Sequence, residues 1–167
     1  MKCVQMALTQ NIFAKLRLKP DQLRAAAEKR FGDAKCLTNS GNRDRANGAM
    51  YMAGFAIECL LKALLLDRHP NLKSEIDPAR LSSSDKEVFD LMYRSHELDD
   101  TCGFLPELKE KLRRAKTKSG SSVWERFQDI CAEWTVYARY SPRHAEIADA
   151  KRYLETVEEV KKWLKKL

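Results

Sequence analysis

Glycine and proline are scarce in this chain, with 6 and 5 copies among 167 residues. Barrels and sandwiches need many tight turns, which these two residue types favour, so the low counts speak against a β-rich fold. The five cysteines include no Cys-x-x-Cys pair, which disfavours a zinc ribbon or a thioredoxin-like redox motif. No stretch of useful length alternates apolar and polar residues. These absences predict an all-α protein.

Common catalytic motifs are also missing: the chain has no GxxxxGK[ST], GxGxxG, HExxH or GxSxG. Histidine occurs only at His69, His96 and His144, too few for a multi-histidine metal site in one subunit. The carboxylates are scattered along helix faces. We therefore expect neither a metal nor a cofactor, and a metal-binding bundle is kept only as a third, weaker hypothesis.

The cysteines and the first residues favour a cytoplasmic location. Cys59 and Cys131 fall in apolar helical patterns and are typical of small buried side chains, and unpaired thiols suit a reducing compartment. Polar side chains interrupt the apolar stretch at the beginning of the chain, which makes it a poor signal peptide.

Apolar spacing predicts a single domain over residues 20–167, preceded by a lead-in at 1–19. We expect four main helices plus short extra ones, packed as an antiparallel up-and-down bundle. Ser84 with Glu87, and Ser122 with Glu125, have the spacing of capping boxes. The expected segments are helices near 20–37, 43–66, 84–92, 106–115, 122–138 and 147–164, with a polar turn at 95–100.

The expected helix at 43–66 is apolar nearly all round, which is typical of the central helix of a bundle. Glu58 and Lys62 interrupt it and would be costly in lipid, so we expect a buried helix and no membrane partner. Because they are four residues apart, they share a face and can form a structural ion pair.

Two of the three histidines, His69 and His96, have ordinary interpretations. His96 precedes Glu97, Asp99 and Asp100, which could satisfy its ring, and His69 is expected to be solvated in a loop.

The stretch 51–64, YMAGFAIECLLKAL, places Gly, Glu and Lys at fixed positions in an apolar helix. It resembles the central helix of HEPN (higher eukaryotes and prokaryotes nucleotide-binding) domains, which in many prokaryotic members reads YxAGxAxExxLKA. SHEL at 95–98 is similar to the family's H-x-L turn, and WTVYARY at 134–140 resembles its carboxy-terminal half. The resemblance covers about residues 20–167 and implies a four- or five-helix bundle that usually forms a homodimer.

The resemblance also implies site residues, because many HEPN members are metal-independent ribonucleases with an R-x4–6-H motif. Arg139 and His144 satisfy it, with four residues between them. His144 is then the candidate general base or acid, and Arg139 the candidate phosphate clamp. Arg143 and Tyr140 would contact the substrate. Two such motifs facing each other across a dimer axis would cleave RNA to leave a 2′,3′-cyclic phosphate.

Two departures from the family pattern leave a second hypothesis open. Active members often carry Asn, Asp or His directly after the arginine, where this chain has Tyr140, and Pro142 interrupts the motif. The first hypothesis is an endoribonuclease, the toxin of a toxin–antitoxin pair or a phage-defence element, with RNA and a nucleotidyltransferase-type antitoxin as partners. The second is a non-catalytic bundle that binds a nucleotidyltransferase partner or a nucleotide. The net charge of +7 permits an anionic partner, but lysine-rich helix ends account for it equally well.

Overall fold

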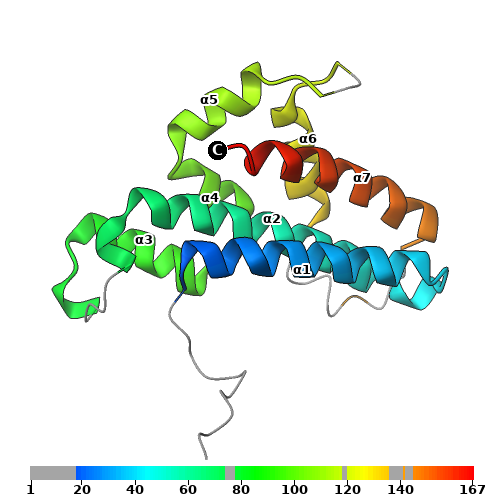
Figure 1. Cartoon of the computed structure of the whole chain (residues 1–167), viewed down its shortest axis with the longest axis horizontal. Coiled ribbons are helices and arrows are strands. Elements are labelled where there is room, and N and C mark those ends of the chain that lie inside the picture. The colour runs from blue at the N-terminus through cyan, green and yellow to red at the C-terminus, as the bar shows by residue number, and fades with distance from the viewer. Residues whose placement is uncertain (1–17, 74–77, 118–119, 136–140, 142–144) are drawn as a thin grey trace, which may run out of the picture.

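The computed structural model describes residues 18–73, 78–117, 120–135, 141 and 145–167. In these parts of the chain the secondary structure is helical, and the only β-type pairing is an isolated antiparallel bridge between Lys116 and Ser122. The expectation of an all-α bundle is confirmed (Figure 1). Its longer elements are α1 (Pro20–Asn39), α2 (Ala46–Arg68), α3 (Ser83–Arg94), α4 (Leu98–Gly103), α5 (Pro106–Arg114), α6 (Val123–Glu133) and α7 (Ile147–Leu164).

A tight connection folds α1 and α2 into an antiparallel hairpin. Pro20 begins α1 at a position where its missing N–H costs nothing. After α1, Gly41 adopts a φ of +67°, a left-handed conformation that a residue with a Cβ rarely takes. The Asn42 side chain then accepts the Asp44 backbone N–H and begins the 3-10 turn Arg43–Arg45, which leads into α2.

The second helix is the centre of the molecule. It packs along α1 and α7 and also meets α4, while α6 packs against α7 (Figure 1). Because neighbours surround it, its apolar residues all find partners, as the sequence predicts for a central helix. By length and composition alone, Arg43–Arg68 could cross a membrane, but 72% of its most apolar stretch is buried within the protein.

Three boundaries differ from the sequence predictions. The helix expected to reach 138 ends at Glu133, because Trp134 is extended and turns its indole onto α2. The capping box expected at Ser84 and Glu87 is wrong: Ser82 caps α3 by accepting the backbone N–H of Asp85 at 3.1 Å. The polar turn expected at 95–100 instead leads into α4, which begins at Leu98 and buries it in the core.

The second capping box is confirmed. The Ser122 hydroxyl accepts the Glu125 backbone N–H at 3.1 Å, and the Glu125 carboxylate accepts the Ser122 N–H at 2.9 Å. This reciprocal pair fixes where α6 begins.

Candidate functional site

The R-x4-H motif occupies the connection between α6 and α7. Arg139, Tyr140, Arg143 and His144 lie outside the described residues. The residues that flank the connection are described, and both ends are attached to α2.

Trp134 attaches the first end. Its indole Nε1 donates a hydrogen bond to the Tyr51 carbonyl oxygen at 3.0 Å, and the two rings stack with centroids 6.0 Å apart. The indole lies directly against Gly54: a Cβ placed there would be 2.1 Å from Trp134 Cδ1. A residue without a side chain is therefore required at this position of α2 for Trp134 to sit as it does.

Ala145 attaches the second end. Its backbone N–H donates to Asn47 Oδ1 at 2.8 Å, and the next residue, Glu146, forms an ion pair with Arg43 at 2.7 Å. Asn47 and Tyr51 are four residues apart on α2, so the two attachment points are separated by about 6 Å along the helix axis. Both ends of the motif-bearing connection are consequently held over the first two turns of α2.

A second cluster of polar side chains lies further along α2. Lys62 Nζ is 2.7 Å from Glu58 Oε1 and donates to the Ser95 carbonyl oxygen at 2.9 Å. His96 Nδ1 lies 3.0 Å from the same Glu58 oxygen. Only 2% of the Glu58 side chain is exposed, whereas 45% of the His96 side chain is. The expected Glu58–Lys62 pair is confirmed, and it also binds the turn before α4.

The partner of His96 differs from the sequence interpretation. The ring meets Glu58 of α2 and not its neighbours Glu97, Asp99 or Asp100. A carboxylate oxygen accepts hydrogen bonds, so His96 Nδ1 is the donor in this contact. His69 was also expected to be solvated; instead its Nδ1 lies 3.3 Å from Asp85 Oδ1 and its side chain is 27% exposed.

His96 lines an open groove of about 550 Å³. Three carboxylates and one guanidinium share that lining, so the groove repels an RNA backbone. We therefore interpret the buried Glu58–Lys62 pair, together with the half-exposed His96, as a structural link between α2 and the α3–α4 turn. The charged groups lining the groove are Glu87, Asp90, Arg94 and Glu97.

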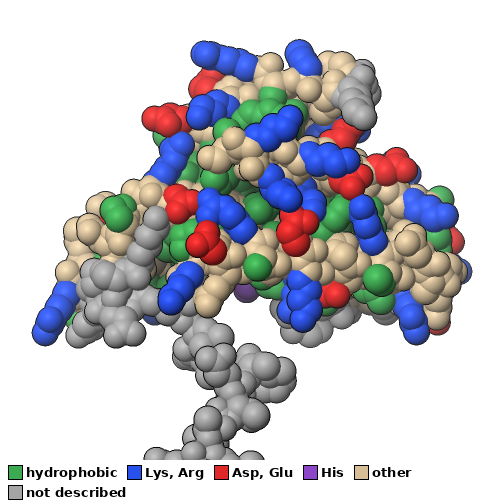
Figure 2. Space-filling model, in the orientation of Figure 1, with side chains coloured by type: hydrophobic (Ala, Val, Ile, Leu, Met, Phe, Trp, Pro, Cys, Tyr) green, Lys and Arg blue, Asp and Glu red, His purple; other side chains and the backbone are tan. Residues whose placement is uncertain are grey.

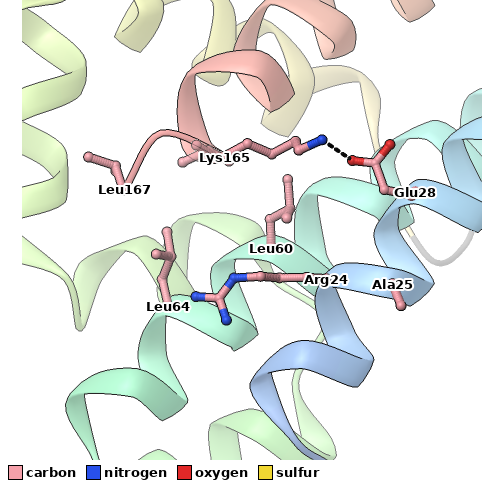
Figure 3. A pocket seen from close by; sticks show the side chains of 8 residues that line it. Arg24, Ala25, Glu28, Leu60, Leu64, Lys165 and Leu167 are labelled. Atoms are coloured by element: carbon pink, nitrogen blue, oxygen red, sulfur yellow. Dashed lines mark ion pairs between the residues drawn. The ribbon is translucent and has the colours of Figure 1, made fainter.

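A partly open pocket of about 240 Å³ lies between α1, α2 and the end of α7 (Figure 3). Leu60, Leu64 and Leu164 provide its apolar surface. Arg24 and Lys165 also line it, but both cations are already paired: Arg24 contacts Asp67, and Lys165 contacts Glu28 at 2.9 Å.

The other candidate chemistries find little support in the described residues. No group of three His, Cys, Asp or Glu side chains in them could hold a metal ion. Burial raises the pKa of Cys59 to about 12 and that of Cys102 to about 11, so both thiols stay protonated near neutral pH and are poor nucleophiles.

The residues that attach the connection to α2 could not be identified from the sequence. Asn47 has no motif around it, and the role of Trp134 depends on a contact 83 residues away. The one local signal is Gly54, a glycine inside an apolar helix, which often marks a close approach of another segment.

Comparison with known proteins agrees with this architecture. The family model of the HEPN domain matches residues 21–167. Searches of curated proteins and of solved structures found no match. The match covers nearly the whole chain, and the family includes ribonucleases and nucleotide-binding modules. The chain therefore belongs to the HEPN domain family.

Proposed function

We propose that this protein is a cytoplasmic, metal-independent endoribonuclease that acts as a homodimer. The observation that carries the proposal is the attachment of the connection between α6 and α7 at both ends. Trp134 and Ala145 bond to residues one helical turn apart on α2, and Arg139 and His144 lie between them in sequence. The two attachment points lie on the first two turns of α2, and we infer that Arg139 and His144 act together there.

The proposed reaction needs two proton transfers and one charge clamp. His144 takes the proton of the ribose 2′-OH, and the 2′ oxygen then attacks phosphorus while the bond to the 5′ oxygen breaks. The Arg139 guanidinium stabilises the charge that develops on the phosphoryl oxygens. The leaving 5′ oxygen receives a proton from His144 of the partner subunit, and the products are a 2′,3′-cyclic phosphate and a 5′-hydroxyl.

The test is RNA cleavage by His144→Ala and Arg139→Ala in the presence of EDTA. General acid–base catalysis by one group contributes about 10²–10⁴-fold, so the His144→Ala rate should fall by that factor. His96→Ala is the matched control, because this histidine faces an acidic groove and should be dispensable for cleavage. Equal rates for wild type and His144→Ala would remove the assignment, and end-group analysis should find the cyclic phosphate.

The pocket in Figure 3 supports a second candidate, a non-catalytic bundle that binds a nucleotide. Its leucine side chains could take a base, and Arg24 and Lys165 also line it. Both cations would first have to leave their carboxylate partners, which makes this candidate weaker. Calorimetric titration with AMP and ATP tests it: heat of binding that Leu64→Trp abolishes would support the nucleotide.

A toxin–antitoxin or phage-defence role extends either candidate to a protein partner, a nucleotidyltransferase-type antitoxin. Co-expression with nucleotidyltransferases encoded beside the gene tests this role. Relief of growth arrest and co-purification would support the pairing, and growth arrest that persists with each of them would contradict it.

A further inference from the structure

We propose that the basic face of α5, together with Trp124 of α6, binds single-stranded RNA outside the cleavage site. The choice of RNA rests on the proposed function. The evidence for an anion-binding surface comes from α5 itself and is independent of the R-x4-H motif.

The charge of this region is concentrated. Residues 109–117 contain five Lys or Arg and one acid, a net +4 of the +7 carried by the whole chain. Most of α5 faces solvent, with Leu108 and Leu112 holding it to the core. In Figure 2, blue Lys and Arg side chains predominate over α5 at the upper end of the molecule.

Few of these cations are neutralised by carboxylates. Arg113 pairs with Glu110 at 3.0 Å. Lys111, Arg114 and Lys116 are exposed, and none of them forms an ion pair with any residue in the described ranges. By contrast, lysines at the end of α7 are already paired with carboxylates of Glu28 or Glu158; they are Lys161, Lys162 and Lys165. A phosphate backbone can therefore bind at α5 without first displacing a carboxylate.

The half-buried indole of Trp124 lies beside two of the α5 cations. Lys109 Nζ is 5.1 Å from the centre of the Trp124 ring, and the Arg113 guanidinium carbon is 5.6 Å from it. Unpaired bases stack on aromatic rings and on guanidinium planes, so this arrangement can take bases as well as phosphates. An acidic protein would pair only with the cations, whereas RNA would also stack its bases on Trp124. We therefore favour single-stranded RNA.

The Trp124 indole is joined to the candidate cleavage site by one rigid element. Trp124 lies in the first turn of α6, and Trp134 directly follows its last residue. Because Trp134 follows Trp124 by ten residues, the backbones of the two residues are about 15 Å apart along the helix. This distance is within reach of one strand of about 4–16 nucleotides, the range occupied by single-strand-binding sites.

The experiment measures RNA binding in a His144→Ala background, so that cleavage does not consume the probe. Lys111→Glu/Arg114→Glu changes two exposed side chains that do not hold the fold. Fluorescence anisotropy with a labelled 16-nucleotide RNA should show at least a 10-fold loss of affinity. The slope of log K against log salt should become shallower by about 1.4, because two phosphate contacts are lost.

Lys29→Glu/Lys86→Glu is the matched control: it makes the same charge change at exposed lysines of α1 and α3. It should bind the RNA within about twofold of the parent protein. Lysines away from α5 attract RNA only at long range, and moderate salt screens that attraction. Trp124→Leu, checked for folding by its unfolding midpoint, should lose about 5- to 150-fold in affinity as one stacked base is lost.

Each outcome separates this inference from the proposed function. If Lys111→Glu/Arg114→Glu binds RNA like the control pair, the α5 surface is wrong, and loss of cleavage in His144→Ala still supports the ribonuclease. If His144→Ala cleaves normally while the α5 variant loses RNA, the ribonuclease assignment fails and the RNA-binding surface stands. Equal competition by polyglutamate would overturn RNA in favour of an acidic protein partner.

Discussion

The indole of Trp134 rests on the backbone of α2 at Gly54. A Cβ at this position would come within 2.5 Å of three indole atoms, and the indole Nε1 bonds to the carbonyl oxygen of Tyr51 three residues earlier. This contact explains why α6 ends where it does: the chain extends at Trp134 so that the ring can reach α2. It also fixes the first end of the connection that carries Arg139 and His144.

Gly54→Ala should therefore destabilise the protein. Alanine inside a helix is normally more stable than glycine by about 0.5–1 kcal/mol, but here its methyl group collides with Trp134, and overpacking typically costs about 1–3 kcal/mol. Urea unfolding followed by tryptophan fluorescence measures the change. The proposed ribonuclease activity should fall as well, because Trp134 has to move.

Gly48→Ala is the matched control on the same helix. A Cβ there would be 3.6 Å from Leu37 Cδ1, an ordinary contact, so this variant should gain about 0.5–1 kcal/mol. A destabilised Gly48→Ala, or a stabilised Gly54→Ala, would contradict the packing described for Trp134.

The second attachment point gives a test of positioning. Asn47→Ala removes the oxygen that accepts the Ala145 N–H, so the cleavage rate should fall on the order of 10- to 100-fold. The free energy of unfolding should change by only about 1 kcal/mol, the usual contribution of one hydrogen bond.

Asn47→Asp keeps the accepting oxygen and should recover most of the rate. The comparison separates positioning from a general loss of structure, because both variants change the same residue and only Asn47→Asp keeps an oxygen that can accept the Ala145 N–H. If the two variants lost activity equally, the Asn47–Ala145 bond would have no part in placing the connection.

Much of the helical architecture could be predicted from local pattern. The composition of 43–66 identifies the central helix, and the spacing of Glu58 and Lys62 predicts their ion pair. These features depend on residues within one or two turns of each other, which a periodic pattern records directly. The capping box that begins α6 is local in the same way.

The predictions that were wrong concern features that depend on packing between distant segments. The apolar spacing around Trp134 continues the helical period, but its contact with Gly54 gains more than another helical turn would, so the helix ends. His96 finds Glu58 across 38 residues because α2 and the turn before α4 pack together. Three consecutive serines could each cap α3, and local sequence does not favour Ser82 over the other two.

The buried pair on α2 should be costly to break and cheap to replace. Lys62→Met leaves the Glu58 carboxylate buried with only the half-exposed His96 as a partner, so stability should fall by about 3–5 kcal/mol. Glu58→Met/Lys62→Met removes both charges and should recover most of that loss, since apolar groups of similar volume fill the site. Chemical denaturation gives both values, and equal losses in the single and double variants would contradict a buried pair.

The pair between α1 and α7 should make stability depend on pH. Hydrogen bonds from Lys161, and then from Lys165, lower the pKa of Glu28 below its usual 4.5. Folding therefore gains stability from the ionised carboxylate above pH 4.5, and this gain disappears as the pH falls through the lowered value. Glu28→Gln should cost about 1 kcal/mol at pH 7, with the difference from wild type vanishing in strong acid.

Unfolding midpoints at pH 7, 5 and 3 measure this dependence. Glu155→Gln is a suitable control, because Glu155 is exposed on α7 and forms no ion pair with a described residue. Its stability should follow that of the wild type at every pH. A Glu28→Gln deficit that persisted unchanged into acid would instead mean that Glu28 acts by packing, since protonating a carboxylate removes its charge but leaves its volume.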